Sequence, residues 1–120
     1  DYDVSEELAA LLSNLAESKS AIIVEGRKDR AALVKIGIDN KRIFVLSTKP
    51  LFSVAEDVAA NFEKAAILTD LDAEGKKLYG RLNTLLQQLG AKVDNSVRNF
   101  LFRNTKLRQI EGIENIIRQQ

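Results

Sequence analysis

Three acidic side chains follow apolar runs of the sequence, and their type and spacing suit them to metal chemistry. Glu25 directly follows the run 21–24, while Asp70 and Asp72 follow the run 65–69. In an extended segment, Asp-x-Asp places both carboxylates on the same side, because side chains alternate with a period of two. Carboxylate oxygens without His or Cys partners favour hard cations. We therefore predict a Mg²⁺ or Mn²⁺ site formed by Glu25, Asp70 and Asp72.

A purely structural role is the alternative for the same acids. Asp70 and Asp72 could be turn and N-cap residues of a helix that starts near Glu74, because Asp caps helix N-termini well. Asp29, in the first turn of another predicted helix, could simply complement the positive end of the helix dipole. A third carboxylate at Glu25 favours the metal site, because clustered carboxylates repel unless a cation or a proton lies among them.

The composition excludes several other chemistries. The 120 residues include no His and no Cys, which rules out Ser-His-Asp triads, thiolate catalysis, disulfides, and zinc or iron–sulfur sites with Cys ligands. The 18 basic and 17 acidic residues leave a net charge of +1, which gives no long-range attraction for nucleic acid. No apolar run approaches the ~20 residues that cross a bilayer, and no signal peptide is recognisable. We expect a cytoplasmic protein that does not bind membranes.

Apolar periodicity predicts alternating helices and strands. Gly37 and Gly90 are expected to end two of the helices. Ser53 is the predicted N-cap of a third, with Glu56 as its capping-box partner. We expect helices at 4–18, 28–36, 53–62, 74–89, 96–104 and 110–118, and strands at 21–24, 43–46, 65–69 and 91–93.

Short apolar strands that alternate with helices predict an α/β fold. We expect a single doubly wound, Rossmann-like parallel sheet of about four strands in the order 2-1-3-4, with helices on both faces. The predicted domain is single and spans 1–120, with its core at about 20–95. This order places the first and third strands side by side, and ligands of such sheets bind at the carboxyl ends of the strands. Glu25, Asp70 and Asp72 should therefore meet in one crevice.

Basic residues are expected beside this crevice. Arg27 and Lys28 follow Glu25 on the same loop, and Lys76 and Lys77 begin the helix after the Asp-x-Asp. Each could bind a phosphate group, and each could equally be a solvated surface charge.

A second group of bases forms a stripe in a segment, residues 95–110, that contains no acid: Arg98, Arg103, Lys106 and Arg108. This stripe could bind phosphate groups. The alternative explanation is a solvated helix face. Phe100 and Phe102 in the same segment are predicted to lie in the core and not to stack on bases. Binding of nucleic acid should then follow its backbone and shape and not its sequence.

Two segments together resemble the TOPRIM domain, which is shared by topoisomerases, bacterial primases, recombination mediators and certain nucleases. Residues 22–29 (IIVEGRKD) resemble its apolar strand followed by Glu-Gly-x-x-Asp, in which Asp29 is the last residue. Residues 67–75 (ILTDLDAEG) resemble its second strand, Asp-x-Asp and Gly. The resemblance covers about residues 20–95. The whole chain is most similar to small stand-alone TOPRIM proteins related to ribosomal RNA maturation nucleases.

The resemblance implies a role for each motif residue. Glu25 would act as general acid or base, and Asp70 and Asp72 would coordinate Mg²⁺. Gly26 would let a phosphate approach the backbone closely, and Gly75 would allow tight entry into the following helix. The implied activity is Mg²⁺-dependent phosphodiester chemistry on nucleic acid, as a small nuclease that acts on RNA or DNA with water as the attacking group.

The alternative is a non-catalytic module that retains the TOPRIM fold and binds nucleic acid or a ribonucleoprotein. Ribosomal RNA is a candidate partner under either interpretation. Neither Tyr2, close to the N-terminus, nor Tyr79, one turn into a predicted helix, is expected to be a nucleophile.

Overall fold

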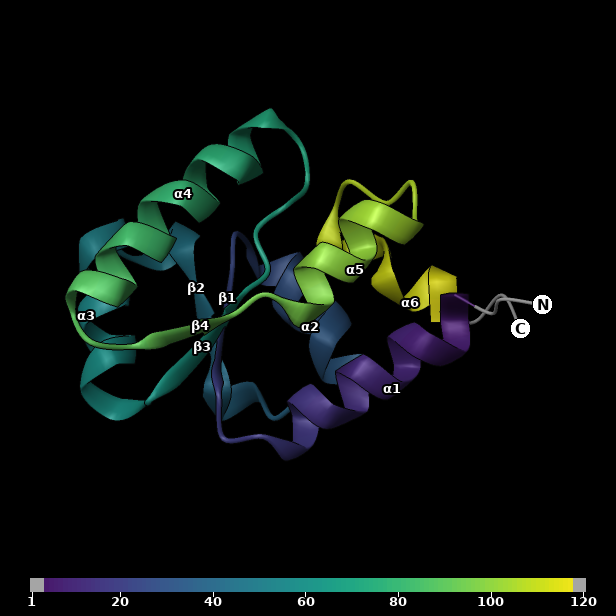
Figure 1. Ribbon diagram of the computed structural model, residues 1–120, viewed down its shortest axis with the longest axis horizontal. Helices are drawn as coiled ribbons and strands as arrows, with labels where there is room; N and C mark the ends of the chain where they lie inside the picture. The colour runs from purple at the N-terminus through teal and green to yellow at the C-terminus, as the bar shows by residue number, and fades with distance from the viewer. Residues whose placement is uncertain (1–3, 118–120) are drawn as a thin grey trace.

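Four parallel strands in the order β2-β1-β3-β4 form the centre of the protein (Figure 1). The structure, a computed structural model, describes residues 4–117. The strands are β1 (Ala21–Val24), β2 (Ile43–Val45), β3 (Lys64–Ile67) and β4 (Lys92–Asp94). This arrangement confirms the predicted α/β fold and its strand order. Because β1 pairs with both β2 and β3 in parallel, Ile23 lies beside Phe44 on one side and Ile67 on the other.

Helices cover both faces of the sheet, so the strands are buried on both sides (Figure 1). The described residues form six α-helices: α1 (Val4–Glu17), α2 (Arg27–Lys35), α3 (Leu51–Asn61), α4 (Ala73–Gln88), α5 (Ser96–Asn104) and α6 (Ile113–Ile117). Ile22 and Val24 of β1 pack with α1, α2, α5 and α6, whereas Ala21 and Ile23 pack with α3 and α4. This alternation explains why the strand sequences are continuously apolar.

Glycine ends two helices, as predicted. Gly37 follows α2 with a φ of 102° and Gly90 follows α4 with a φ of 91°, a backbone region that glycine enters without steric cost. After α2, the Ile38 N–H donates to the Leu33 carbonyl oxygen. The chain therefore turns sharply back toward the sheet at both positions.

The start of α3 differs from the prediction. The helix begins at Leu51, directly after Pro50, and the Pro50 carbonyl oxygen accepts the Val54 N–H. Ser53 is therefore inside the first turn, and the predicted capping box of Ser53 and Glu56 is wrong. Proline favours this earlier start. The N–H groups at a helix N-terminus have no partner within the helix, so a residue without an N–H loses nothing there.

Two other elements differ from the prediction by more than one residue at an end. β3 ends at Ile67 and not at Thr69, although the Leu68 N–H still donates to the Ile23 carbonyl oxygen. The last predicted helix is split into a 3₁₀ turn, Ile110–Gly112, and the short α6, and residue 118 lies outside the described residues. Within residues 4–117, no helix combines the length and apolarity needed to cross a membrane.

Candidate functional site

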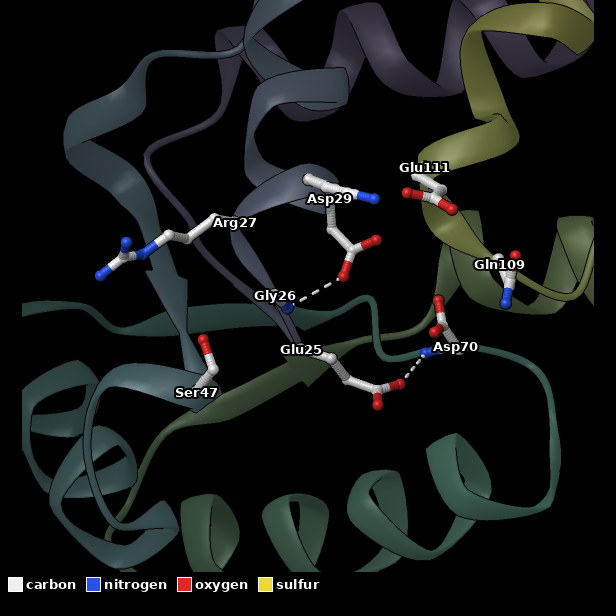
Figure 2. Close-up of a pocket in the computed structure, with 9 residues that line it drawn as sticks. Glu25, Gly26, Arg27, Asp29, Ser47, Asp70, Gln109 and Glu111 are labelled. Atoms are coloured by element: carbon white, nitrogen blue, oxygen red, sulfur yellow. Dashed lines mark hydrogen bonds between the residues drawn. The ribbon is translucent and has the colours of Figure 1, made fainter.

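Glu25 and Asp70 meet where β1 and β3 end, as their positions after adjacent parallel strands predict. The Asp70 backbone N–H donates to Glu25 Oε2 at 2.6 Å (Figure 2). Both side chains are half-buried. One carboxylate oxygen of Glu25 thus fixes the loop that carries Asp70, so the two acids hold a defined relative position.

The C-terminal segment closes the other side of Asp70. Asp70 Oδ1 accepts the Ile110 N–H at 2.9 Å, and the Leu71 N–H donates to the Arg108 carbonyl oxygen at 2.7 Å. These bonds bring Gln109 and Glu111 to the crevice, together with Ser47 from the loop after β2. No motif of the sequence points to any of these three residues.

Asp72 takes the structural role that the sequence left open. It is the N-cap of α4, and its Oδ1 accepts the Gly75 N–H at 2.8 Å. Asp72 is exposed and lines a neighbouring cavity with Lys106, Arg108 and Glu111. In the part of the chain from residue 4 to 117, no three acidic residues form a group that could hold a metal ion. Asp72 is therefore near the crevice, but it does not complete a three-carboxylate site with Glu25 and Asp70.

Asp29 lies deeper than expected for a helix-dipole partner. Its side chain is only 7% exposed, and its Oδ2 accepts the Gly26 N–H at 2.9 Å. Gly26 itself has a φ of −136°, and a Cβ there would meet only Asp29 Oδ2, at 3.8 Å. The fold therefore does not require glycine at position 26, and the missing side chain leaves space in the crevice.

The crevice is a cavity of about 450 Å³ with an acidic interior. Figure 2 shows the carboxyl groups of Asp29, Asp70 and Glu111 facing one another, whereas the guanidinium of Arg27 extends away from them. The lining residues are Glu25, Gly26, Arg27, Lys28, Asp29, Ser47, Asp70, Gln109 and Glu111.

Burial and mutual repulsion favour protonation of these acids. Burial raises the pKa of Glu25, and the charges of Asp70, Asp72 and Asp29 raise it further, against the lowering effect of the Asp70 N–H. Burial also raises the pKa of Asp29 and of Asp70, and in both cases the charge of Glu111 adds to the effect. The site therefore concentrates negative charge in a place where bound cations or protons are favoured.

A buried arginine is bonded to the loop that carries Asp70. Arg98 is 7% exposed and donates to the Thr69 carbonyl oxygen, to Thr69 Oγ1 at 3.0 Å and to the Asp70 carbonyl oxygen at 3.0 Å. Its guanidinium lies 4.8 Å from the centre of the Tyr79 ring. The sequence suggested that Arg98 belongs to a solvated stripe, and this is wrong for Arg98, whereas Arg103, Lys106 and Arg108 are exposed. Arg98 fixes the loop between β3 and α4 and supplies positive charge that partly offsets the raised pKa of Asp70.

Gly75 meets a strict steric requirement in the same loop. A Cβ at this position would lie 1.9 Å from the Asp70 carbonyl oxygen and 2.4 Å from its carbon. The Gly75 carbonyl oxygen accepts from Thr69 Oγ1 at 2.7 Å, which holds the first turn of α4 against the end of β3. The close entry into α4 is therefore possible only for glycine.

The predicted phosphate-binding bases lie in two places. Arg27 and Lys28 are exposed at the rim of the crevice, and Lys76 and Lys77 are exposed on the first turn of α4.

The prediction that Phe102 lies in the core is wrong, because half of its surface is exposed. Helical geometry explains this: Phe100 and Leu101 occupy the buried face of α5, and the next residue turns away by about 100°.

The fold and the acidic crevice define the class of this molecule, a doubly wound α/β protein with a site at the carboxyl ends of two central strands. No family model matches the chain. A UPF0292 protein of Pyrococcus horikoshii is 40% identical over 107 residues, which cover 89% of this chain and 79% of that protein. A UPF0292 protein of Methanocaldococcus jannaschii is 31% identical over 114 residues, covering 90% and 88%. This chain belongs to the UPF0292 family.

A solved structure is similar over most of the chain. A protein from Aquifex aeolicus has a TM-score of 0.78 and 31% sequence identity, covering 88% of this chain and 94% of its own. The family name states no reaction.

The raised pKa values predict how stability depends on pH without metal ions. The folded protein holds protons on Glu25, Asp29 and Asp70 more tightly than the unfolded chain does. Their stabilising contribution is therefore present below the ordinary pKa values of 4.5 for Glu and 3.8 for Asp, and is lost as the pH rises through the raised values. We expect the free energy of unfolding in EDTA to fall as the pH rises above about 4.

A charge-removing variant tests this explanation. Asp70→Asn keeps an oxygen for the Ile110 N–H and removes one repelling charge. It should raise apo stability at neutral pH by about 1 kcal/mol, a value reduced for solvent screening at a half-buried group, and flatten the pH profile. Glu56→Gln removes an exposed charge on α3 and should keep the wild-type profile. Denaturant unfolding across the pH range measures the stability profile of each variant. A wild-type profile in Asp70→Asn would contradict the explanation.

Proposed function

We propose that this protein is a Mg²⁺-dependent enzyme that hydrolyses phosphodiester bonds of RNA or DNA, in the manner of TOPRIM nucleases, and that it acts in the cytoplasm. The observation that carries the proposal is the junction of Glu25 and Asp70. Two acids 45 residues apart are held together at adjacent strand ends by one hydrogen bond, in a crevice that concentrates negative charge. The TOPRIM resemblance supports it, because both motifs lie at this junction.

The donor chemistry of the crevice fits a hard cation. The acids offer only carboxylate oxygens, and their raised pKa values indicate repulsion that a cation would relieve. Mg²⁺ commonly uses one or two protein carboxylates and completes its coordination with water and substrate phosphate. Asp70 and Asp72 would hold the ion, with Glu25 beside it, because each Asp has one oxygen bonded to a backbone N–H and a second oxygen for a ligand. Mg²⁺ would supply Lewis-acid stabilisation of the phosphate charge.

The residues of the chain would divide the remaining work. Glu25 would take the proton of the attacking water, or give a proton to the oxygen that leaves phosphorus, which its raised pKa favours. Gly26 would admit a phosphate close to the backbone, because the crevice has space where a side chain would be. Arg27 and Lys28, at the rim, would contact neighbouring phosphates.

Incubation with labelled substrates tests the proposal. Structured ribosomal RNA and single- and double-stranded DNA should be incubated with the purified protein in Mg²⁺, in Mn²⁺ and in EDTA. We expect cleavage of at least one substrate with either metal and none in EDTA. Mn²⁺ should also stabilise the wild type against denaturant but not Asp70→Asn, because binding to the folded state raises its stability. Intact substrates in every condition, together with no stabilisation by Mn²⁺, would reject the enzyme.

A non-catalytic binding module is the second candidate, and one observation favours it. Asp72 uses an oxygen to cap α4, and no three acids in the described part of the chain form a metal-holding group. Such a module would bind RNA, DNA or a ribonucleoprotein without cutting it. Binding of the same substrates without cleavage in Mg²⁺ or Mn²⁺ would identify this function.

A further inference from the structure

An aromatic ring lies on the surface at the end of α5, beside two cationic side chains. Phe102 is 50% exposed, although its neighbours Phe100 and Leu101 are buried. Lys76 Nζ lies 4.8 Å from the centre of the Phe102 ring, and Arg108 Cζ lies 5.9 Å from it. Both cations are thus within the distance at which they are attracted to the face of an aromatic ring.

These cations are available to a negatively charged partner. Between residues 4 and 117, the one ion pair joins Lys49 and Asp57, so neither Lys76 nor Arg108 is paired with a carboxylate. The segment 95–110, which carries Phe102 and Arg108, contains no acid at all. An exposed ring among unpaired cations is complementary to a base with its flanking phosphates.

The ring is also connected to the candidate site. Arg108 and Lys106 line a cavity of about 710 Å³ whose lining also includes Asp72. This cavity and the acidic crevice share Gln109 and Glu111 as lining residues. The Arg108 carbonyl oxygen accepts the Leu71 N–H, so the backbone beside the ring is tied to the Asp70–Asp72 loop. A chain lying on Phe102 could therefore continue along this cavity to the crevice.

We propose that Phe102 is a stacking platform for a base of single-stranded nucleic acid, with Lys76 and Arg108 contacting the adjacent phosphates. The approach of that strand to Asp72 and the crevice rests on the proposed function, whereas the stacking does not. A single strand fits better than a duplex, because an exposed ring can stack only on a base whose face is not already covered by its neighbours. The proposal restricts the substrate class to single strands and to the unpaired parts of structured RNA.

Binding measured without metal tests the platform. Fluorescence anisotropy in EDTA should compare labelled single-stranded RNA and DNA of about 10 nucleotides with a duplex and with an abasic strand. Wild type should bind the single strands more tightly than the duplex. Phe102→Ala should weaken single-strand binding by at least about fivefold, whereas Phe102→Trp should retain it. On the abasic strand, wild type and Phe102→Ala should bind alike.

Matched variants separate stacking from general surface effects. Phe52 on α3 is also 50% exposed and lies in a different cavity, between α3 and α4, so Phe52→Ala should not change binding. Lys76→Gln and Arg108→Gln should each reduce the slope of log affinity against log salt by about 0.7, the value for one phosphate contact of a single strand. The exposed Lys41 provides the control Lys41→Gln, which should keep the slope.

Several results would overturn the platform. These are equal affinity of wild type and Phe102→Ala for single strands, equal losses on normal and abasic strands, or equal binding of duplex and single strand. Its failure is distinguishable from failure of the proposed function. Metal-dependent cleavage that is unaffected in Phe102→Ala would keep the enzyme and reject the platform, whereas base-dependent binding without cleavage would keep the platform and reject the enzyme.

Discussion

Gly75→Ala should lower the free energy of unfolding by about 3 kcal/mol. The added Cβ would lie 1.9 Å from the Asp70 carbonyl oxygen and 2.9 Å from its Cα, so backbone must move. Moving this backbone would break hydrogen bonds, because the Asp70 carbonyl oxygen accepts from Arg98 and the Gly75 carbonyl oxygen accepts from Thr69. The same displacement should separate Asp70 from Glu25 and remove any stabilisation by Mn²⁺.

Gly80 is a matched control on the same helix. A Cβ there would meet nothing within 4 Å, and Ala is the better helix former. Gly80→Ala should therefore raise the free energy of unfolding by about 0.5–1 kcal/mol. Denaturant unfolding measures the change in the free energy of unfolding for both variants. Changes of the same sign and size would show that α4 does not pack against the end of β3 in the way described.

Glu25→Gln should reduce the rate of metal-dependent cleavage by about 10²–10⁴-fold. The amide keeps an oxygen that can accept the Asp70 N–H, so the junction of β1 and β3 should remain folded. It cannot exchange a proton with water or with the leaving oxygen, which is the role proposed for the carboxyl group. Single-turnover cleavage with saturating enzyme measures this step without interference from binding.

Two comparisons make the result specific. Glu56→Gln, which removes an exposed carboxylate from α3, should cleave at the wild-type rate. Glu25→Gln should also bind single strands in EDTA as tightly as wild type or more tightly, because it loses a negative charge near the phosphates. A wild-type cleavage rate in Glu25→Gln would assign the proton transfer to another group of the crevice, and the proposed role of Glu25 would be wrong.

The acidic junction shows what sequence reasoning can achieve. The buried-type runs at 21–24 and 65–69 predict parallel strands from local composition, and alternation with helices predicts a doubly wound sheet, for which 2-1-3-4 is a common strand order. Once that order is known, residues that directly follow adjacent strands must be neighbours. Glu25 and Asp70 meet for this reason, although 45 residues separate them. The glycine ends of α2 and α4 were equally local signals.

Asp72 shows where a local pattern was ambiguous. Asp-x-Asp before a helix suits a metal site and an N-cap equally well, because both use a carboxylate oxygen at the same place. In the structure, Asp72 Oδ1 caps α4 through Gly75. Whether its other oxygen also binds Mg²⁺ stays a prediction.

The positions of Arg98 and Phe102 along their helix carried a signal that the sequence prediction did not use. Arg98 lies next to Val97 and three residues before Leu101, on the buried face of α5, and Phe102 lies just off that face. A helical projection predicts a buried arginine and an exposed phenylalanine, whereas a count of bases between 95 and 110 predicts a solvated stripe. The count fails at Arg98 alone, because it ignores the period of the helix, whereas Arg103, Lys106 and Arg108 are exposed.

Local hydrophobic patterns are enough to predict the strands and helices, and with the strand order of a common doubly wound sheet they predict that Glu25 meets Asp70. The rest of the site depends on contacts between segments that are far apart in the sequence. Arg98 bonds to the Asp70 carbonyl oxygen across 28 residues, and the Ile110 N–H bonds to Asp70 across 40. The fold of the C-terminal segment over the crevice, which brings Glu111 beside Asp29, depends on packing against α2, and no periodicity encodes such a long-range contact.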